Sequence, residues 1–515
     1  MKTYVAADLF NDSLGPIMCG PSSSHTGGPA RVGRLARDLC GGSFKSVAIQ
    51  FCENTSFAKG YKSMGSDKGL YGGLMGWSPD NKELYNAVDI ANQKGLNIKI
   101  EILDEEAEQD NAIWFQCETE SGFRFSARMV SIGGASVEIV DIDGLPVLLT
   151  GGRYELVVWG NSDVRGGIET ILGRAGAFAN ERLSVFSLPE KIDIEHIRSI
   201  KGVIYATVVD PVLPCVILDE RNVLFSSAGE LLKWLEGKPM DIADAAFAYQ
   251  QAISGWDKRQ VYNYAKSLME AMSGSIEEGL RDDGRGFFCL RPVSGKMKDR
   301  WESKSFIPMG VIERASVYAQ AVSEANMSMR RLVAAPTGGS AGVIPGAVLS
   351  CAREGDFGEE KTINALMVAA LIGAFIFTRA TFSGYHGGCS AEIGSASGMS
   401  AAAVAYLYGA DTETCLKAAG IAIQNLIGLA CDKLASGVEL PCIQRNALGS
   451  ANAILSANMA MCGVDPYLPL DETIDAAYQY SSFCAKAIHD GGVKDNCGIS
   501  GSPTARLVRR RFEAD

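Results

Sequence analysis

The stretch INALMVAALIGAFIFT, residues 363–378, decides the fold class of the C-terminal half of this chain. It contains no charged residue and is apolar on every side, which is typical of a helix buried all round. It is shorter than the roughly 20 residues that cross a bilayer, so we interpret it as a core helix. Similar helical segments rich in Ala, Gly, Met and Leu occur at 228–237, 261–280, 311–329 and 414–430. They predict a large all-α domain over residues 221–515.

The N-terminal part of the chain has a different periodicity. SVAIQF (46–51) has the character of a short strand, and ARVGRLARDL (30–39) has apolar residues at helical spacing. Alternation of such segments predicts an α/β domain over residues 1–150. Residues 151–220 follow as strand, turn, helix and further strands, which indicates a small ferredoxin-like module. The expected fold class is therefore a multidomain α+β protein.

Composition limits the possible partners. The 515 residues are 47% hydrophobic and 21% charged, and they carry a net charge of −12. This is the composition of a globular protein, and the negative charge disfavours nucleic acid or an anionic membrane as a partner. The first 20 residues include Asp8 and Asp12 and lack the apolar core of a secretory signal. We expect a cytoplasmic protein that binds a small molecule.

The segment GPSSSHTGGPARVGRLARDL (20–39) is a candidate substrate site. A helix N-terminus offers free N–H groups and the positive end of the helix dipole, and nearby hydroxyls complete a cradle for a carboxylate. The alternative is a polar turn that only caps the helix, but a cap needs one such residue. The polar side chains concerned are Ser22, Ser23, Ser24, His25 and Thr26.

A second candidate site is rich in glycine. APTGGSAGVIPGAV (335–348) and SGYHGGCSAEIGSASGMSAAA (383–403) combine Gly with small hydroxyl residues. This composition lets the backbone approach a ligand closely, although it also suits tight helix packing. His386 and Cys389 lie in the same glycine-rich turn, which favours a functional site.

Fourteen cysteines in a cytoplasmic chain are not expected to form disulfides, and most should be small buried apolar residues. Cys389, Cys431 and Cys442 lie in unusual turns next to Gly, Asp or Pro. No CxxC spacing is present, so a structural zinc site is not indicated. Three thiols can bind three irons of a cubane and leave the fourth open to substrate. Spacing alone does not exclude the alternative that these three cysteines are ordinary buried thiols.

Together these motifs resemble those of the iron–sulfur-dependent L-serine dehydratases, whose β and α domains occur separately or fused. GPSSSHTGGPARVG (20–33) and VSIGGASVEIVDIDG (130–144) resemble the β-domain motifs. APTGGSAGVIPG, GGCSAEIGSASGM and CDKLASGVELPCIQRN (431–446) resemble three successive α-domain motifs. Residues 152–215 resemble the ACT-like module of some members, so the resemblance runs nearly end to end.

The resemblance implies that Cys389, Cys431 and Cys442 hold a 4Fe-4S cluster with one open iron. It implies a lyase of amino acid metabolism and gluconeogenesis that converts L-serine to a 2-keto acid and ammonia, and we expect a homodimer. The substrate-binding residues would be Ser22, Ser23, Ser24, Thr26, Thr337, Gly338, Gly339 and Ser340. The catalytic candidates would be His25, His386 and Asp67.

Two departures from the family motifs leave alternatives open. Met64 stands where the family has a histidine, and Lys433 stands where it has a proline. His386 could supply the missing imidazole, and Lys433 or Arg379 could serve a more acidic substrate. The same elimination on threonine or a cysteine-type compound, or a silent amino-acid-binding protein, are further alternatives. A pyridoxal-phosphate enzyme is disfavoured because Lys296, the nearest candidate, lacks a suitable context. Cys484 and Cys497 are interpreted as structural thiols.

Overall fold

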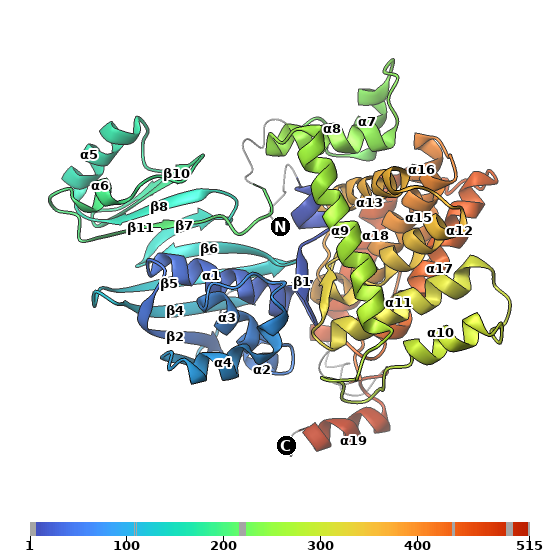
Figure 1. Cartoon of the computed structure of the whole chain (residues 1–515), viewed down its shortest axis with the longest axis horizontal. Coiled ribbons are helices and arrows are strands. Elements are labelled where there is room, and N and C mark those ends of the chain that lie inside the picture. Colours follow the sequence, from blue (N-terminus) through green and yellow to red (C-terminus); the bar gives the residue numbers. More distant parts are fainter. Residues whose placement is uncertain are drawn as a thin grey trace. The chain divides into compact units, whose positions relative to one another are not determined.

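The structure, a computed structural model, divides into two compact units. One unit comprises residues 24–218, and the other comprises residues 1–23 together with 219–515. Figure 1 labels the elements of both. The structure describes residues 7–107, 109, 111–215, 223–434, 438–490 and 498–512.

The first unit, called here the α/β unit, contains a six-stranded sheet in the order β3-β2-β4-β5-β6-β7. β2 and β3 are parallel, and every other neighbouring pair is antiparallel. The strands are β2 (Phe44–Cys52), β3 (Ile98–Leu103), β4 (Ala112–Thr119), β5 (Arg124–Gly133), β6 (Ser136–Ile142) and β7 (Leu145–Leu149). The helices beside the sheet in Figure 1 are α1 (Gly28–Leu39), α2 (Ser56–Gly60), α3 (Ser66–Leu74) and α4 (Ala87–Gln93). The alternation of strands and helices agrees with the predicted α/β pattern.

A second, four-stranded sheet in this unit has the order β11-β8-β10-β9 and is antiparallel throughout. Its elements are β8 (Tyr154–Trp159), α5 (Ser162–Leu172), β9 (Phe178–Ala179), β10 (Leu183–Leu188), α6 (Glu195–Arg198) and β11 (Tyr205–Val209). This βαββαβ order is the predicted ferredoxin-like topology. Leu156 and Phe186 pack on the module's own helices, whereas Val157 and Trp159 join the core of the six-stranded sheet. Both faces of the small sheet are therefore buried.

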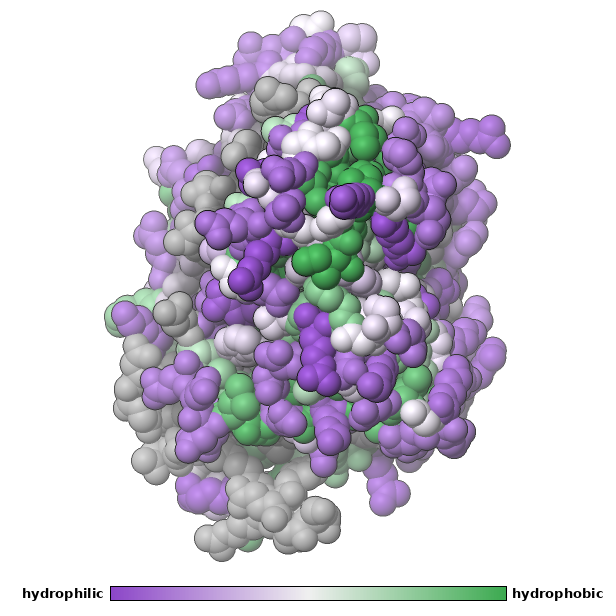
Figure 2. Space-filling view, turned by 90° about the vertical axis from the view of Figure 1, so that its left-hand side faces the viewer, coloured by the Kyte–Doolittle hydropathy of each residue, from purple (hydrophilic) through white to green (hydrophobic). Residues whose placement is uncertain are grey.

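The α/β unit exposes few large apolar side chains. Among its described residues these are Ile102, Ile132, Leu148, Ile171 and Ile204. Single exposed apolar side chains are ordinary on folded proteins. Figure 2 shows one face of the molecule, where a strip of hydrophobic residues lies among mostly hydrophilic ones.

The second unit, called here the helical unit, is built around α13 (Glu359–Arg379). Residues 363–376 of this helix are almost all buried, as the sequence predicted. Among the described residues it is the one helix long and apolar enough to cross a membrane, and most of it lies inside the protein. The other helices are α7 (Ala228–Leu235), α8 (Ile242–Ser254), α9 (Lys258–Gly279), α10 (Ser294–Glu302), α11 (Val311–Met327), α12 (Ser350–Glu354), α14 (Gly384–Cys389), α15 (Ser395–Leu407), α16 (Thr412–Gln424), α17 (Cys442–Met461), α18 (Leu470–Asp490) and α19 (Pro503–Phe512).

The N-terminal residues belong to the helical unit, a placement that the sequence patterns did not predict. We expected residues 1–150 to form one domain. Instead β1 (Ile17–Cys19) pairs antiparallel with β12 (Arg331–Val333), and Ser13 Oγ donates to the Ala370 carbonyl of α13 at 2.6 Å. This pairing joins segments more than 300 residues apart in sequence and leaves no local signal in either.

A buried carboxyl group makes the stability of the α/β unit depend on pH. Burial raises the pKa of Glu155 on β8 from 4.5 to about 7, although Ser187 Oγ donates to Oε2 at 2.7 Å and acts to lower it. The folded protein thus binds a proton that the unfolded chain releases, so stability falls as pH rises through this interval.

We expect Glu155→Gln to remove this pH dependence while it keeps an acceptor for Ser187. The variant should stabilise the unit by about 3 kcal/mol at pH 8 and by almost nothing at pH 4. Amide hydrogen exchange of β8 and β10, compared with wild type at each pH, measures the difference. An equal effect at both pH values would contradict the assignment.

Candidate active site

The three candidate cysteines come from three segments of the helical unit. Cys389 ends α14 and is 2% exposed, Cys442 begins α17 and is 5% exposed, and Cys431 lies in the segment between α16 and α17. Cys389 and Cys442 interact with each other, and this interaction lowers the pKa of Cys389 and raises that of Cys442. Folding therefore brings together thiols that are far apart in sequence.

Gly388 allows the segment before Cys431 to approach Cys389. Its backbone has φ 62° and ψ −163°, a conformation that essentially only glycine adopts. A Cβ at this position would lie 2.7 Å from the Leu429 oxygen and 3.0 Å from the Cys431 nitrogen. The Ser390 amide donates to the Leu429 carbonyl at 3.0 Å, and the Leu429 amide donates to Ser390 Oγ at 2.9 Å. The segment that ends in Cys389 and Ser390 and the segment that leads to Cys431 are thus held together by hydrogen bonds.

The first turn of α17 fixes Cys442 to the glycine-rich loop 337–342. Asn446 Oδ1 accepts from the Gly342 amide at 2.9 Å, and Asn446 Nδ2 donates to the Gly339 carbonyl at 2.8 Å. Arg445 donates to the Ala430 carbonyl at 2.7 Å. One helical turn therefore connects this loop to the segment that carries Cys431.

The chain before Cys442 is held by a buried carboxylate. Glu439 is 4% exposed and accepts three backbone N–H bonds, from Phe288 at 2.5 Å, Cys289 at 2.9 Å and Leu290 at 2.7 Å. Charge-assisted bonds of this kind are stronger than neutral ones. The 288–290 loop therefore fixes the approach to Cys442.

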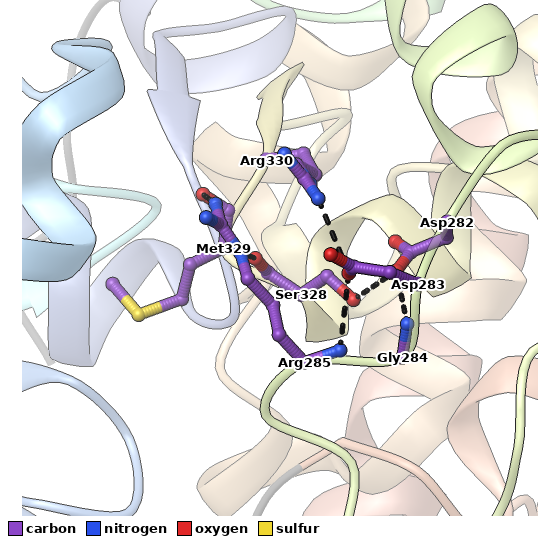
Figure 3. Close-up of polar contacts among 7 residues, drawn as sticks. All are labelled: Asp282, Asp283, Gly284, Arg285, Ser328, Met329 and Arg330. Atoms are coloured by element: carbon purple, nitrogen blue, oxygen red, sulfur yellow. Dashed lines mark hydrogen bonds and ion pairs between the residues drawn. The ribbon is translucent and has the colours of Figure 1, made fainter.

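This loop is itself anchored by a polar cluster at the end of α11 (Figure 3). Asp282 accepts from the Gly284 amide at 2.8 Å and from Ser328 Oγ at 2.7 Å. Arg285 donates to the Ser328 carbonyl at 2.8 Å, and Arg330 pairs with Asp283 at 3.2 Å. The cluster joins the loop after α9 to the turn that leads into β12.

Two charged side chains lie close to the thiols. Thr337 Oγ1 donates to Glu392 Oε1 at 2.7 Å; burial raises the pKa of Glu392, while Thr337 and Lys433 act to lower it. Burial acts to lower the pKa of Lys433, but negative charge on Cys431, Cys442, Glu392 and Cys389 raises it above its usual value. A lysine and a glutamate are therefore part of the cysteine site.

The remaining predicted substrate residues of the helical unit lie beside the same loop. Ser23 Oγ accepts from the Gly338 amide at 3.3 Å, and Thr337 and Ser340 form a reciprocal cap around residues 338–340. Ser22 is half-buried, and His386 is exposed with Nδ1 3.0 Å from Ser383 Oγ. The structure thus brings Ser23, Thr337, Gly338, Gly339 and Ser340 near the cysteine segments.

The other predicted residues lie in the α/β unit. His25 Nε2 is 3.2 Å from Ser56 Oγ, and Asp67 accepts from the Lys68 amide at 2.8 Å. Thr26 is fully buried, and its hydroxyl donates to the Met64 carbonyl at 2.7 Å. Burial raises the pKa of Asp67. The Ser24 carbonyl accepts from Ser131 Oγ at 2.9 Å.

Sequence reasoning missed Glu392, Glu439 and Asn446. Glu392 had a usable signal, since it is the one charged residue within 383–403 and comes three positions after Cys389. Glu439 and Asn446 act through backbone groups far away in sequence, so their motif gave no indication of their partners. Cys484 is half-buried on α18, and Cys497 lies outside the described residues.

Comparison with known proteins places the chain in a family. The sequence model described as serine dehydratase alpha chain matches residues 94–490. The chain belongs to the serine dehydratase alpha-chain family. Membership confirms the resemblance stated above and the prediction of a dehydratase-class enzyme.

Named relatives within this serine dehydratase family support the assignment. The L-serine dehydratase alpha chain of Peptoniphilus asaccharolyticus is 39% identical over 290 residues, which cover 56% of this chain and 98% of that protein. The probable L-serine dehydratase alpha chain of Bacillus subtilis is 31% identical over 293 residues, 56% of this chain and 95% of that protein. L-serine dehydratase 2 of Escherichia coli is 32% identical over 269 residues, 50% of this chain and 57% of that protein.

Proposed function

We propose that this protein is an iron–sulfur-dependent L-serine dehydratase that releases a 2-keto acid and ammonia. The observation that carries the proposal is the convergence of three cysteine segments beside the 337–340 loop. Gly388 and Ser390 bring the Cys431 segment to Cys389, and Asn446 ties the Cys442 turn to Gly339. The names of the relatives support serine as the substrate.

The donor set, three cysteine thiols, is one that an iron–sulfur cluster uses. Within the described ranges, no three His, Cys, Asp or Glu side chains are arranged around one ion. A cubane does not need this arrangement, because each thiolate binds a different iron. Cys389, Cys431 and Cys442 would hold the cluster, and the positive charges of Lys433 and Arg445 favour thiolates there. When bound, a cluster with one open iron supplies a Lewis acid for the substrate hydroxyl.

The protein's own groups bind and orient the amino acid. Ser23 and Asn446 bind the backbone of the 337–340 loop, so its small residues are fixed in place. Dehydration also requires a base for the α-proton, within hydrogen-bond reach of it. We propose His25, His386 and Asp67 as the acid–base candidates.

The finer architectural and cellular assignments are also part of this proposal. The βαββαβ topology of residues 154–209 supports an ACT-like module within the α/β unit. We further propose a cytoplasmic homodimer. Its mass in analytical ultracentrifugation tests the dimer.

Product release by anaerobically reconstituted protein tests the activity. We expect ammonia and keto acid in equal amounts from L-serine, and slower release from L-threonine and L-cysteine. Faster release from L-cysteine or L-threonine would favour the alternative eliminations. Binding of L-serine to fully loaded protein without ammonia release would favour a silent binding protein and overturn the proposal.

A further inference from the structure

His25 lies in a closed ring of hydrogen bonds that joins four segments of the α/β unit. It belongs to the π-helical turn immediately before α1. His25 Nε2 is 3.2 Å from Ser56 Oγ at the start of α2, and Ser56 Oγ donates to Asn111 Oδ1 at 2.5 Å. The Ser131 amide donates to the Asn111 carbonyl at 3.2 Å, and Ser131 Oγ donates to the Ser24 carbonyl at 2.9 Å. The ring therefore closes through the peptide bond between Ser24 and His25.

The groups on both sides of this imidazole are fixed. The His25 ring lies with its centroid 5.0 Å from that of Phe57, which is fully buried. Asn111 has φ 63°, a left-handed conformation that asparagine adopts more readily than most residues. Its carbonyl is bound by the amide of Ser131, a buried residue of β5. The acceptor at the end of the relay is therefore held by the sheet, and the imidazole plane is held by an aromatic side chain.

The lengths of these contacts determine which atoms donate. A separation of 2.5 Å is typical of an O–H···O bond and short for an N–H···O bond, so the Asn111 atom that faces Ser56 is the amide oxygen. An amide oxygen only accepts, so the single hydroxyl proton of Ser56 is directed to it. Ser56 Oγ then offers a lone pair to His25 Nε2, and Nε2 carries the proton of that bond. A neutral imidazole protonated at Nε2 has its lone pair on Nδ1.

We propose that Ser56 and Asn111 are positioning residues that hold His25 protonated at Nε2, so that Nδ1 is its proton-accepting atom. This inference rests on the proposed dehydration and selects one atom of one acid–base candidate. Nδ1 takes the α-proton, the electron pair of the broken C–H bond becomes the carbon–carbon double bond, and the 3-hydroxyl leaves with its bonding pair. Ser56 Oγ accepts from Nε2–H before and after this transfer, so the relay needs no rearrangement as the imidazole becomes charged.

Nitrogen NMR of the full-length protein, with isotope-labelled histidine, measures the tautomer directly. The chain has four histidines, and His25→Gln identifies the signals of His25. At a pH where the imidazole is neutral, we expect Nε2 to be protonated and Nδ1 to be unprotonated. Asn111→Gly removes the acceptor and suits the positive φ, so Ser56 can donate to the ring and a second tautomer should appear. A wild-type ring protonated at Nδ1, or a tautomer that Asn111→Gly leaves unchanged, would overturn the proposal.

Turnover of L-serine tests whether this tautomer serves proton transfer. Ser56→Ala and Asn111→Gly should each lower kcat about 10- to 100-fold with little change in KM, which is part of the roughly 10²- to 10⁴-fold that a general base contributes. Both residues act through one chain of hydrogen bonds, so the double variant should be hardly slower than either single variant. Ser56→Thr keeps the hydroxyl and should retain most of kcat.

Ser121→Ala is the matched control. It removes an exposed hydroxyl of the same unit, 2.9 Å from Thr119 Oγ1, and should leave the His25 signals and kcat unchanged. Losses that multiply in the double variant, or a loss in Ser56→Thr equal to that in Ser56→Ala, would refute the relay. Ammonia release by a protein whose His25 is protonated at Nδ1 refutes this inference alone. A ring that is protonated at Nε2 and responds to Asn111→Gly, in a protein that releases no ammonia, refutes only the proposed activity.

Discussion

Replacing Cys442 with alanine is expected to eliminate cluster binding and to lower L-serine turnover about a thousandfold or more. Cys442 is one of only three proposed ligands, and it lies at the fixed start of α17. A Lewis acid at a leaving hydroxyl contributes several kcal/mol to catalysis, and each 1.36 kcal/mol corresponds to a factor of ten in rate. Iron and sulfide content, the brown absorbance and ammonia release measure the effect.

The matched control is Cys462→Ala. Cys462 is exposed and caps the opposite end of α17, so its loss should leave iron content and turnover unchanged. The cluster-free Cys442→Ala protein should also unfold within about 1 kcal/mol of cluster-free wild type, because only a small side-chain volume is lost. Full iron content and full activity in Cys442→Ala would remove the central evidence for the cluster.

Replacing Gly388 with alanine is expected to displace Cys431 and to empty the site although no ligand is changed. Two penalties add at this position. A non-glycine residue at φ 62° and ψ −163° is strained by about 1–3 kcal/mol, and the new Cβ would meet the Leu429 oxygen at 2.7 Å. We expect the protein to lose most of its iron and at least about 3 kcal/mol of local stability. Iron analysis and hydrogen exchange of residues 429–434 measure both.

Gly409→Ala separates the two penalties. Gly409 also has a positive φ, 88°, but a Cβ there meets nothing within 4 Å. It should show backbone strain alone and bind iron as wild type does. If both variants kept the same iron content, the close approach of the two backbones would not be what holds the site together.

Local patterns were sufficient for the elements of the fold. The uncharged run in α13 predicted a buried helix because a helix without a polar face has no side to present to water. The order of short strands and helices in residues 151–220 predicted a ferredoxin-like module, and the strand order found over residues 154–209 agrees. The pairing of β1 with β12 was not predictable in this way. Side-chain periodicity indicates that a segment is a strand, but it does not indicate which distant strand that segment pairs with.

The candidate site shows the same difference between what short motifs indicate and what only long-range contacts reveal. The chemistry of the cysteines and of the 337–340 loop could be recognised from their motifs. The role of Glu439 could not, because the three backbone N–H groups that donate to it come from residues about 150 positions away. Arg379 shows the opposite case. From the sequence its charge was a candidate for binding substrate, but in the structure Asp475 binds this guanidinium.

The sequence by itself determined that the helix over residues 363–376 is buried and which three cysteines match the family motifs, because burial patterns and motifs are properties of short segments. The tertiary structure alone decided that Gly388 admits the Leu429–Cys431 backbone and that Asn446 joins Cys442 to the glycine-rich loop. These are contacts between segments about 40 to 110 residues apart. Their energies depend on distance in space, which only the folded chain defines.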